Sequence, residues 1–540
     1  MVRIVSTFCL SPRLFHSFTP IDTRDILVYS YSCPIFVHVV ILLLEGATTT
    51  MTFPIPFVRR RLSLLLAPML ALLCAAMTLS FAFAQAATLV SISTDPFTNS
   101  TSRHKTEVEP DTFAYGSTIV SAFQVGRFSD GGSSDIGWAT STNAGKTWTH
   151  GFLPVTIYKG GSYNRASDPA VAYDAKHNVW LISMLAINNS ASGLLVSVIN
   201  SRSLDGGLTW NSTTTTAPYL SGTGYDKNWI VCDDTASSPY YGHCYTEWDD
   251  SAKGNLVLMS TSTNGGATWS SPKTNANSAS VLAGQPLVQP NGTVVVPIDV
   301  LTNTTTTIGA YTSTNGGTSW SSTINISTIR YHNQAGNLRS GPLPSAELDG
   351  SGTIYVVWGD CRFETSCSAD DLVYSTSTNG TSWSAVKRIP IDPVGSGVDH
   401  FIPGIAVDKA TSGANAHLAL TYYYYANTAC TPSTCKLYVG TITSNNAGTS
   451  WSVKQTQAGP MSLTWLPNAN GYMVGDYIST SFVQGKAYSV FAVAKAPSNK
   501  QLNEGMYTES GGIAITGGAV GASSDSIRTS RTDRVSTTAR

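Results

Sequence analysis

Acidic residues recur along the chain at a spacing that could bring several carboxylates to one place. The residues that open a short repeated motif are Glu109, Asp168, Asp226, Gln285, Leu343, Ile402 and Asp476. The first six follow one another at intervals of about 58 or 59 residues, and the seventh comes late, after an insertion. If each copy opens an equivalent strand, four acids converge on a single site.

The chemistry expected of such a site is that of crowded carboxylates. Close carboxylates repel one another unless one of them takes up a proton or a cation binds between them. We therefore expect a structural Ca²⁺ ion, or a cationic or polyhydroxyl ligand, and no other cofactor. In the alternative interpretation, Lys227, Arg127 and Arg362 pair with these acids and the ring of charges is purely structural.

A second motif, a polar turn that ends in tryptophan, repeats with nearly the same period. Its copies read STNAGKTW, SLDGGLTW, STNGGATW, STNGGTSW, STNGTSW and SNNAGTSW, and they end at Trp148, Trp210, Trp269, Trp320, Trp383 and Trp451. The Asn or Asp at the third position can accept backbone N–H bonds, and glycine supplies a positive φ. The tryptophan can then be buried between neighbouring sheets. We expect these turns to have a structural role rather than a catalytic one.

The segments between these motifs alternate short apolar strands with turns that contain Gly or Asp, and four strands fit into each unit. Four antiparallel strands per repeat are typical of a propeller blade, and blades must stack around an axis to bury both faces. We therefore predict an all-β fold, a β-propeller of seven four-stranded blades, with six blades as the alternative. The last unit lacks a tryptophan turn, so ATLVSIST near the N-terminus is expected to complete it and to close the ring.

The two ends of the chain differ from the repeats. Residues 51–86 carry three arginines, a long apolar run and an Ala-Gln-Ala site, the pattern of a cleaved secretory signal peptide, with a membrane anchor as the alternative. Residues 1–50 are expected to be a mis-called start outside the fold. The propeller is assigned to residues 87–510, and residues 511–540 lack an apolar pattern and are expected to be disordered. The protein is thus predicted to be secreted, without a membrane partner after cleavage.

Cysteine usage agrees with export, and the net charge bears on the class of partner. Six of the nine cysteines follow the leader, in three close pairs: Cys232–Cys244, Cys361–Cys367 and Cys430–Cys435. In an oxidising compartment we expect each pair to form a local disulfide. The formal net charge is −1, which gives no electrostatic reason to expect a nucleic-acid partner.

The tryptophan turns resemble the Asp-box of the sialidase superfamily, also called the BNR repeat. The family pattern is Ser-x-Asp-x-Gly-x-Thr-Trp; Asp205 keeps the acid, and Asn replaces it in the other five copies. The resemblance covers residues from about 105 to 510. It implies a sialidase-like propeller and, as an activity, an exo-acting glycoside hydrolase that retains configuration through a tyrosine nucleophile.

Three segments are similar to those that carry functional residues in sialidases. AFQVGRFSDGGSSDIGWATSTNAGKTW resembles the segment before the first Asp-box, which implies an arginine of the site at Arg127 and an acid/base at Asp135, with Asp130 as the alternative. VVWGDCRF resembles the segment that leads to an arginine for the substrate carboxylate, Arg362. GDYISTSF resembles the strand of the nucleophile, Tyr477.

The sequence departs from sialidases at two positions. The first opener, EVEPDTF, contains no arginine, and no Glu lies just upstream of the AEL segment. The expected partner is a glycan or glycoconjugate, and the alternative to a hydrolase is a non-catalytic propeller that binds glycans or a cell surface. The residues expected to bind substrate are Asp168, Asp226, Lys227, Arg339 and Asp476.

Overall fold

The computed structural model describes residues 88–517, except residues 192, 211 and 303–304, together with three two-residue strands outside that range. Two of these strands, β1 (Val28–Tyr29) and β2 (Ile41–Leu42), pair with each other in a compact unit that spans Met1–Phe83. All other described elements belong to the second unit, Ala84–Arg540. The predicted signal peptide at 51–86 lies outside the described residues, as does the predicted mis-called start apart from these two strands.

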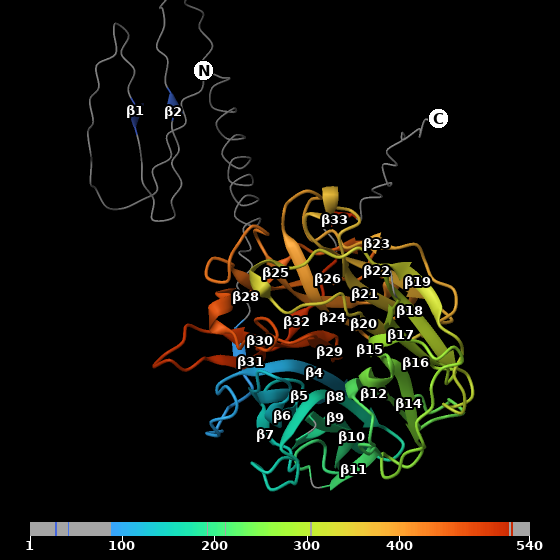
Figure 1. Ribbon diagram of the computed structural model, residues 1–540. Helices are drawn as coiled ribbons and strands as arrows, with labels where there is room; N and C mark the ends of the chain where they lie inside the picture. Colours follow the sequence, from blue (N-terminus) through green and yellow to red (C-terminus); the bar gives the residue numbers. More distant parts are fainter. Residues whose placement is uncertain are drawn as a thin grey trace, which may run out of the picture. The chain divides into compact units, whose positions relative to one another are not determined.

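The sheets of the second unit are antiparallel, and they pair strands that mostly follow one another in the sequence (Figure 1). We number the strand groups one to seven. Group one contains β4 (Glu107–Tyr115), β5 (Thr118–Arg127), β6 (Ser133–Ser141) and β7 (Thr149–Phe152). Group two contains β8 (Arg165–Asp174), β9 (Val179–Ser190), β10 (Gly193–Ser203) and β11 (Ser212–Ala217). A single pairing of Ser133 with Ala166 joins the two groups into one sheet.

The middle of the chain forms three further groups. Group three contains β12 (Tyr225–Cys232), β13 (Cys244–Asp250) and β14 (Leu256–Ser262). Group four contains β15 (Val281–Gly284), β16 (Leu287–Val288), β17 (Val294–Leu301), β18 (Thr306–Ser313) and β19 (Ile324–Thr328). Group five contains β20 (Ser345–Leu348), β21 (Ile354–Asp360), β22 (Asp371–Ser377) and β23 (Lys387–Arg388).

The remaining strands form groups six and seven. Group six contains β24 (Asp399–Val407), β25 (Leu418–Tyr425), β26 (Leu437–Ser444) and β28 (Gln455–Met461), and β27 (Ser450–Trp451) pairs apart with β33 (Val520–Gly521). Group seven contains β29 (Ser479–Val483), β30 (Lys486–Ala494), β31 (Glu504–Glu509), β3 (Leu89–Ser91) and β32 (Ile513–Ala514). The short 3₁₀ turns are η1 (Ser251–Lys253), η2 (Ala335–Asn337), η3 (Thr365–Cys367), η4 (Gly413–Asn415) and η5 (Leu463–Trp465).

The first strand of each group lies toward a common centre, where successive first strands contact one another. The contacts run in the cyclic order β4, β8, β12, β15 and β16, β20, β24, β29 and back to β4. Hydrogen bonds cross these contacts: the Val171 N–H donates to the Asp111 carboxylate at 2.7 Å, and the Ser479 hydroxyl donates to the Thr112 carbonyl at 3.2 Å. The predicted all-β class is therefore confirmed, with antiparallel sheets that surround a centre.

The N-terminal strand completes the last group, as the sequence predicts. Leu89 of β3 lies opposite Glu509 of β31 in an antiparallel pair. The fold extends past the predicted boundary at residue 510, because Ile513 in β32 pairs with Ala487 of β30. Ile513 is buried and packs against Ala419 and Ala487, so this part of the predicted tail is ordered by an apolar contact.

The six tryptophan turns share one hydrogen-bond pattern. In each turn the Asn or Asp side chain accepts an N–H bond at 2.9–3.0 Å from a residue three or four positions later. The serine that opens each turn accepts a second bond at 2.9–3.0 Å from a glycine N–H. Trp210, Trp320 and Trp451 are at most 5% exposed, so the turns stabilise the sheets as expected.

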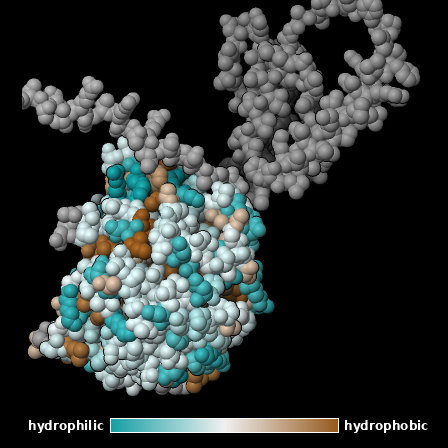
Figure 2. Space-filling view, turned by 90° about the vertical axis from the view of Figure 1, so that its right-hand side faces the viewer, coloured by the Kyte–Doolittle hydropathy of each residue, from teal (hydrophilic) through white to brown (hydrophobic). Residues whose placement is uncertain are grey.

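Three disulfides join the predicted pairs, Cys232–Cys244, Cys361–Cys367 and Cys430–Cys435. The face of the molecule in Figure 2 is mostly of intermediate hydropathy, and its hydrophobic residues form small separate patches. Among the described residues, no helix has the length and apolarity that a membrane crossing requires.

Five of the central strands bend at a bulge close to their start, where the pairing register with the next strand shifts. The residues in left-handed backbone conformation at these bulges are Glu109, Asp168, Lys227, Ala283 and Ile402, with φ between 48° and 56°. Such a conformation costs a non-glycine residue about 1–3 kcal/mol and is enriched at functional sites. The structure thus corrects the predicted equivalence, because Lys227 and Ala283, and not Asp226 and Gln285, occupy the repeated position.

Candidate functional site at the centre of the ring

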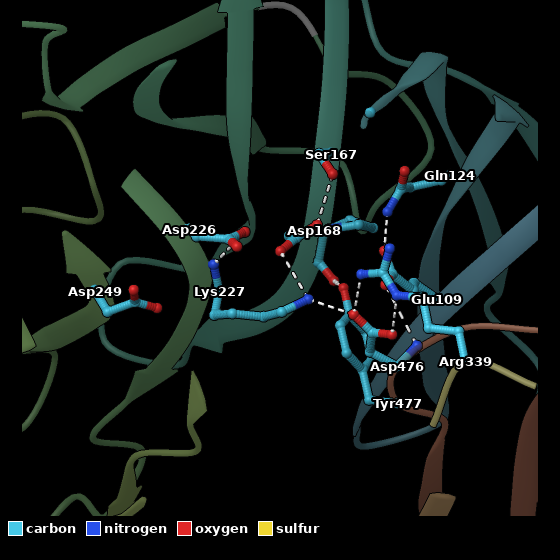
Figure 3. A network of polar contacts seen from close by, with 12 residues as sticks. Glu109, Gln124, Ser167, Asp168, Asp226, Lys227, Asp249, Arg339, Asp476 and Tyr477 are labelled. Carbon is cyan, nitrogen blue, oxygen red and sulfur yellow. Dashed lines mark hydrogen bonds and ion pairs between the residues drawn. The ribbon is translucent and has the colours of Figure 1, made fainter. Parts of the chain in front are cut away.

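Asp476 is the centre of a charge cluster that joins distant parts of the chain (Figure 3). The Lys227 ammonium lies 2.5 Å from Asp476 Oδ2. The Arg339 guanidinium binds both oxygens, with Nε 2.7 Å from Oδ1 and Nη2 2.5 Å from Oδ2. Two parallel bonds of this kind fix the carboxylate in position as well as in charge. Residues from β12, from the β19–β20 connection and from the segment before β29 therefore meet at one point.

Glu109 connects the first strand to this cluster. Its carboxylate accepts a bond from the Gln124 amide and another, at 3.3 Å, from the backbone N–H of Asp476. The Gln124 carbonyl oxygen in turn accepts a bond of 2.7 Å from Arg127 Nη1. Arg127 is buried, and it contacts Glu109 indirectly, through the side chain of Gln124.

Two further aspartates lie beside Lys227. Asp168 Oδ2 is 3.7 Å from the Lys227 ammonium, and Asp168 Oδ1 accepts a bond of 2.6 Å from the Ser167 hydroxyl. Asp226 accepts the Lys227 backbone N–H at 3.0 Å, and its register partner on β13 is Asp249. Asp226 is only partly buried, unlike Asp168, so it is the cluster's aspartate with access to solvent.

The environment separates the pKa values of these carboxyl groups. Burial, with the nearby charges of Asp168 and Asp476, raises the pKa of Glu109 to about 8. Burial also raises the pKa of Asp226 to about 6, although Lys227 opposes the shift. Burial disfavours ionisation of Asp476 too, but Lys227 and Arg339 hold its pKa well below the usual range. Protonated and ionised carboxyl groups therefore lie side by side near neutral pH, as they do in acid–base sites.

Tyr477 lies beneath the cluster with its hydroxyl already engaged. The hydroxyl donates to the Pro169 carbonyl at 3.2 Å, and the ring packs edge-to-face on Trp229 with 5.0 Å between centroids. Burial and the charges of Glu109 and Asp168 raise the pKa of Tyr477 well above its usual value. In this conformation the phenol is protonated and is a hydrogen-bond donor.

Two cavities lie along the centre of the ring. The one beside the cluster is small, about 30 Å³, and its lining includes Lys227, Asp476 and Tyr477. A cavity of about 400 Å³ lies at the other ends of the central strands, and its lining includes Glu347. Trp229 and Gln285 line both cavities, and Trp229 packs against Tyr477 between them.

The structure brings together all five predicted substrate-binding residues and only part of the predicted catalytic set. The residues that meet in the cluster are Asp168, Asp226, Lys227, Arg339, Asp476 and Tyr477. Asp135 is fully buried, and its carboxylate accepts bonds from the Ile136 N–H and the Thr156 hydroxyl.

Arg362 and the alternative acid Asp130 have partners elsewhere. The Arg362 guanidinium lies 2.6 Å from Asp360, the residue at the end of β21, and donates to Thr328 at 2.6 Å. Asp130, which is exposed, forms an ion pair of 2.6 Å with the buried Arg165. The segments thus resemble those of sialidases along the chain, but these side chains make local contacts instead of forming an arginine site around Tyr477.

Sequence reasoning missed Gln124 and Asp249. Gln124 lies within a strand whose apolar character predicts core, so nothing in its residue type singles it out. The position of Lys227 had a signal: it follows Asp168 by the same 59 residues that separate Asp168 from Glu109. Of the three cations in the alternative interpretation, Lys227 pairs with these acids, whereas Arg127 contacts Gln124 and Arg362 contacts Asp360. The second cation of the cluster is Arg339.

No protein-family profile and no curated protein matches the chain. Among solved structures, a Hadza microbial sialidase matches at 12% identity and a TM-score of 0.40, over 70% of this chain and 73% of that protein. The Trypanosoma rangeli sialidase in complex with sialic acid matches at 13% identity and 0.42, over 79% of this chain and 59% of its own, less than two thirds of its length.

A third similar structure is an α-L-arabinanase from Penicillium chrysogenum complexed with arabinobiose. It matches at 14% identity and a TM-score of 0.40, over 62% of this chain and 93% of that protein. These three solved structures are thus two sialidases and an arabinanase.

Proposed function

We propose that the protein is a secreted, glycan-active β-propeller, in which the seven strand groups are seven blades closed by the pairing of β3 with β31. The cyclic order of contacts from β4 round to β29 supports this closure. Three disulfides support export to an oxidising compartment.

We further propose that the centre of the ring is a glycoside hydrolase site. The observation that carries this proposal is the separation of pKa values within one cluster, with Asp226 near 6 and Asp476 far lower. Asp226 would protonate the leaving oxygen as the glycosidic bond breaks, and a water molecule would then attack the anomeric carbon and return a proton to Asp226. The ionised carboxylates of Asp168 and Asp476 would stabilise the positive charge that develops on the sugar ring in an oxocarbenium-like transition state.

The charges of the cluster favour a neutral sugar over an acidic one. The guanidinium that enters the cluster directly, Arg339, is already bound through two bonds to Asp476. Four carboxyl groups surround it and Lys227, so the carboxylate of a sialic acid would meet repulsion instead of a free arginine clamp. A neutral glycan is therefore the proposed substrate class.

A panel of fluorogenic glycosides, neutral and sialylated, tests the proposal with the wild type and Asp226→Asn. We expect turnover of a neutral glycoside that falls as the pH rises through about 6, because the acid must carry its proton. Asp226→Asn should lower kcat by about 100-fold or more. Equal turnover by both proteins, or turnover of the sialoside alone, would contradict this assignment.

A second candidate function is glycan binding without hydrolysis. It is favoured by the engaged Tyr477 hydroxyl and by the cavity of about 400 Å³ at the other ends of the central strands, away from the charge cluster. Binding of labelled glycans by the wild type, with no product released over a long incubation, would support this candidate over the hydrolase.

A further inference from the structure

Three buried polar atoms without hydrogen-bond partners converge between strand groups five and six, apart from the central cluster. They belong to Asp371 at the start of β22, Asp392 after β23 and His400 in β24. One ligand-type atom of each residue lies within 4.8 Å of the other two. Asp371 Oδ2, Asp392 Oδ2 and His400 Nε2 all lack a hydrogen bond. Buried polar atoms are rarely left unpaired, so this convergence requires an explanation.

The histidine can take the form that a metal ion requires. His400 is 1% exposed, and its Nδ1 atom faces the Asp370 carbonyl at 3.4 Å. In the tautomer that has its proton on Nδ1, this nitrogen donates to the carbonyl and Nε2 presents a lone pair toward the aspartates. A metal-bound histidine usually has its other nitrogen bonded in this way.

Arg388 holds the two carboxylates through their Oδ1 atoms. Its Nη2 atom lies 2.7 Å from Asp371 Oδ1 and 3.4 Å from Asp392 Oδ1. The Oδ2 atoms remain, and Asp392 Oδ2 lies 3.4 Å from His400 Nε2. The guanidinium also offsets part of the negative charge of the pair, which would otherwise repel within a buried site.

We propose that Asp371, Asp392 and His400 bind one divalent transition-metal ion of the zinc type. One imidazole nitrogen and two carboxylate oxygens suit such an ion, which takes these donors at about 2.0–2.2 Å. The three atoms would have to close by roughly 1 Å from their present separation to reach that distance. Asp392 is partly exposed and precedes the exposed residues 393–396, which give the ion and a bound water a path from solvent.

Lys454 is the natural competitor for this ion. Its ammonium lies 3.5 Å from Asp392 Oδ2, its side chain is 33% exposed, and it also lies over the Tyr424 ring. Metal binding therefore requires the lysine to turn outward, which its exposure allows. Replacement of Lys454 by methionine removes the competing charge and should make the metal bind several-fold more tightly.

Calorimetric titration of the metal-free full chain with ZnCl₂ tests the proposal, with Co²⁺ absorption as a second readout of the ligand set. We expect one Zn²⁺ per chain, with affinity lowered at least about 100-fold in His400→Asn, more than the loss of a ligand-orienting partner causes. Asp392→Asn gives the same test at a partly exposed position that folding tolerates better. Thermal unfolding of each variant shows whether the fold is retained.

The matched control is His332→Asn, because His332 also lies beside an aspartate, 3.0 Å from Asp399, but outside this trio. The Zn²⁺ affinity of His332→Asn should equal that of the wild type, and the affinity of Lys454→Met should be higher than both. The absence of stoichiometric binding would overturn the proposal. Equal binding by His400→Asn, Asp392→Asn and the wild type would overturn it as well, since the ion would then be elsewhere.

Discussion

The six tryptophan turns, called the rim below, and the centre of the ring use the same repeat in opposite ways. At the rim, six turns repeat both the backbone and the side chains, and the Asn or Asp acceptor makes the same bond in each copy. At the centre, five strands repeat the bulge, but the residue at the bulge differs from copy to copy. The bulge residues include two acids, one lysine and two apolar residues.

This difference shows where the repeat is free to diverge. A rim turn contacts only its own and the neighbouring sheet, so each copy meets the same packing requirement. The central residues face one another around the ring, and each must complement the charges opposite it. Identical acids at every position would repel, whereas Asp476, Lys227 and Arg339 together form a paired set. Every turn at the rim therefore stabilises its sheet in the same way, whereas each central residue contributes a different charge to one shared cluster.

Removal of the acid that joins the two central cations should give the largest effect. Asp476→Ala leaves Lys227 and Arg339 without their closest carboxylate partner in a buried site, which costs about 3–5 kcal/mol of unfolding free energy. Urea unfolding of the variant and the wild type measures the change. A loss below 1 kcal/mol would mean that the centre is as tolerant as the protein surface.

The pH dependence of stability should show the cost of burying Glu109. The pKa of Glu109 is raised from 4.5 to about 8, so the folded state holds a proton that the unfolded state releases. Its contribution is therefore complete below pH 4.5 and is lost as the pH rises toward 8. Glu109→Gln should flatten this fall by at most about 1.4 kcal/mol per pH unit. Parallel pH profiles for the two proteins would show that Glu109 is ionised in the fold.

A rim acceptor should matter less. Asn315→Ala removes the acceptor of the Ser319 N–H, a bond of 3.0 Å. We expect a loss of about 1 kcal/mol, the usual size for one hydrogen bond in a turn, and no change in glycan binding or turnover. A loss in activity as large as that of a central variant would contradict the claim that the turns have a purely structural role.

The smallest effect is expected at the one rim turn with an acid. Asp205→Asn should change the unfolding free energy at pH 7 by less than about 0.5 kcal/mol, because five other turns make the same bonds with Asn. Slight burial opposes ionisation of Asp205, but bonds from Thr209 and Ser203 lower its pKa to about 2. The wild type should therefore lose stability below pH 4 more steeply than the variant, which acid titration of unfolding can measure.

The rim could be predicted from the sequence because its signal is local. A turn such as STNGGATW carries its own hydrogen bonds, so the repeat, the order of the strands, the disulfides and the closing strand β3 all followed from spacing. The centre could be predicted only in outline. Acids near the openers were expected to meet, and Asp168, Asp226 and Asp476 do so.

The remaining features of the centre depend on contacts between distant residues. A bulge shifts the register, which places Lys227 at the position expected for Asp226. Gln124 reaches Glu109 across a sheet, and Arg339 comes from a connection without a repeat. Segment resemblance could not give the direction of the Asp135 and Arg362 side chains, which is set by Thr156 and Asp360.

The distinction between centre and rim is tested most directly by parallel measurements of glycoside turnover and unfolding free energy for Asp226→Asn and Asp205→Asn. The account predicts that Asp226→Asn loses about 100-fold or more in kcat while its stability is kept, and that Asp205→Asn keeps both. Equal turnover by the two variants, whether both fall or both match the wild type, would contradict the assignment of the chemistry to the centre of the ring.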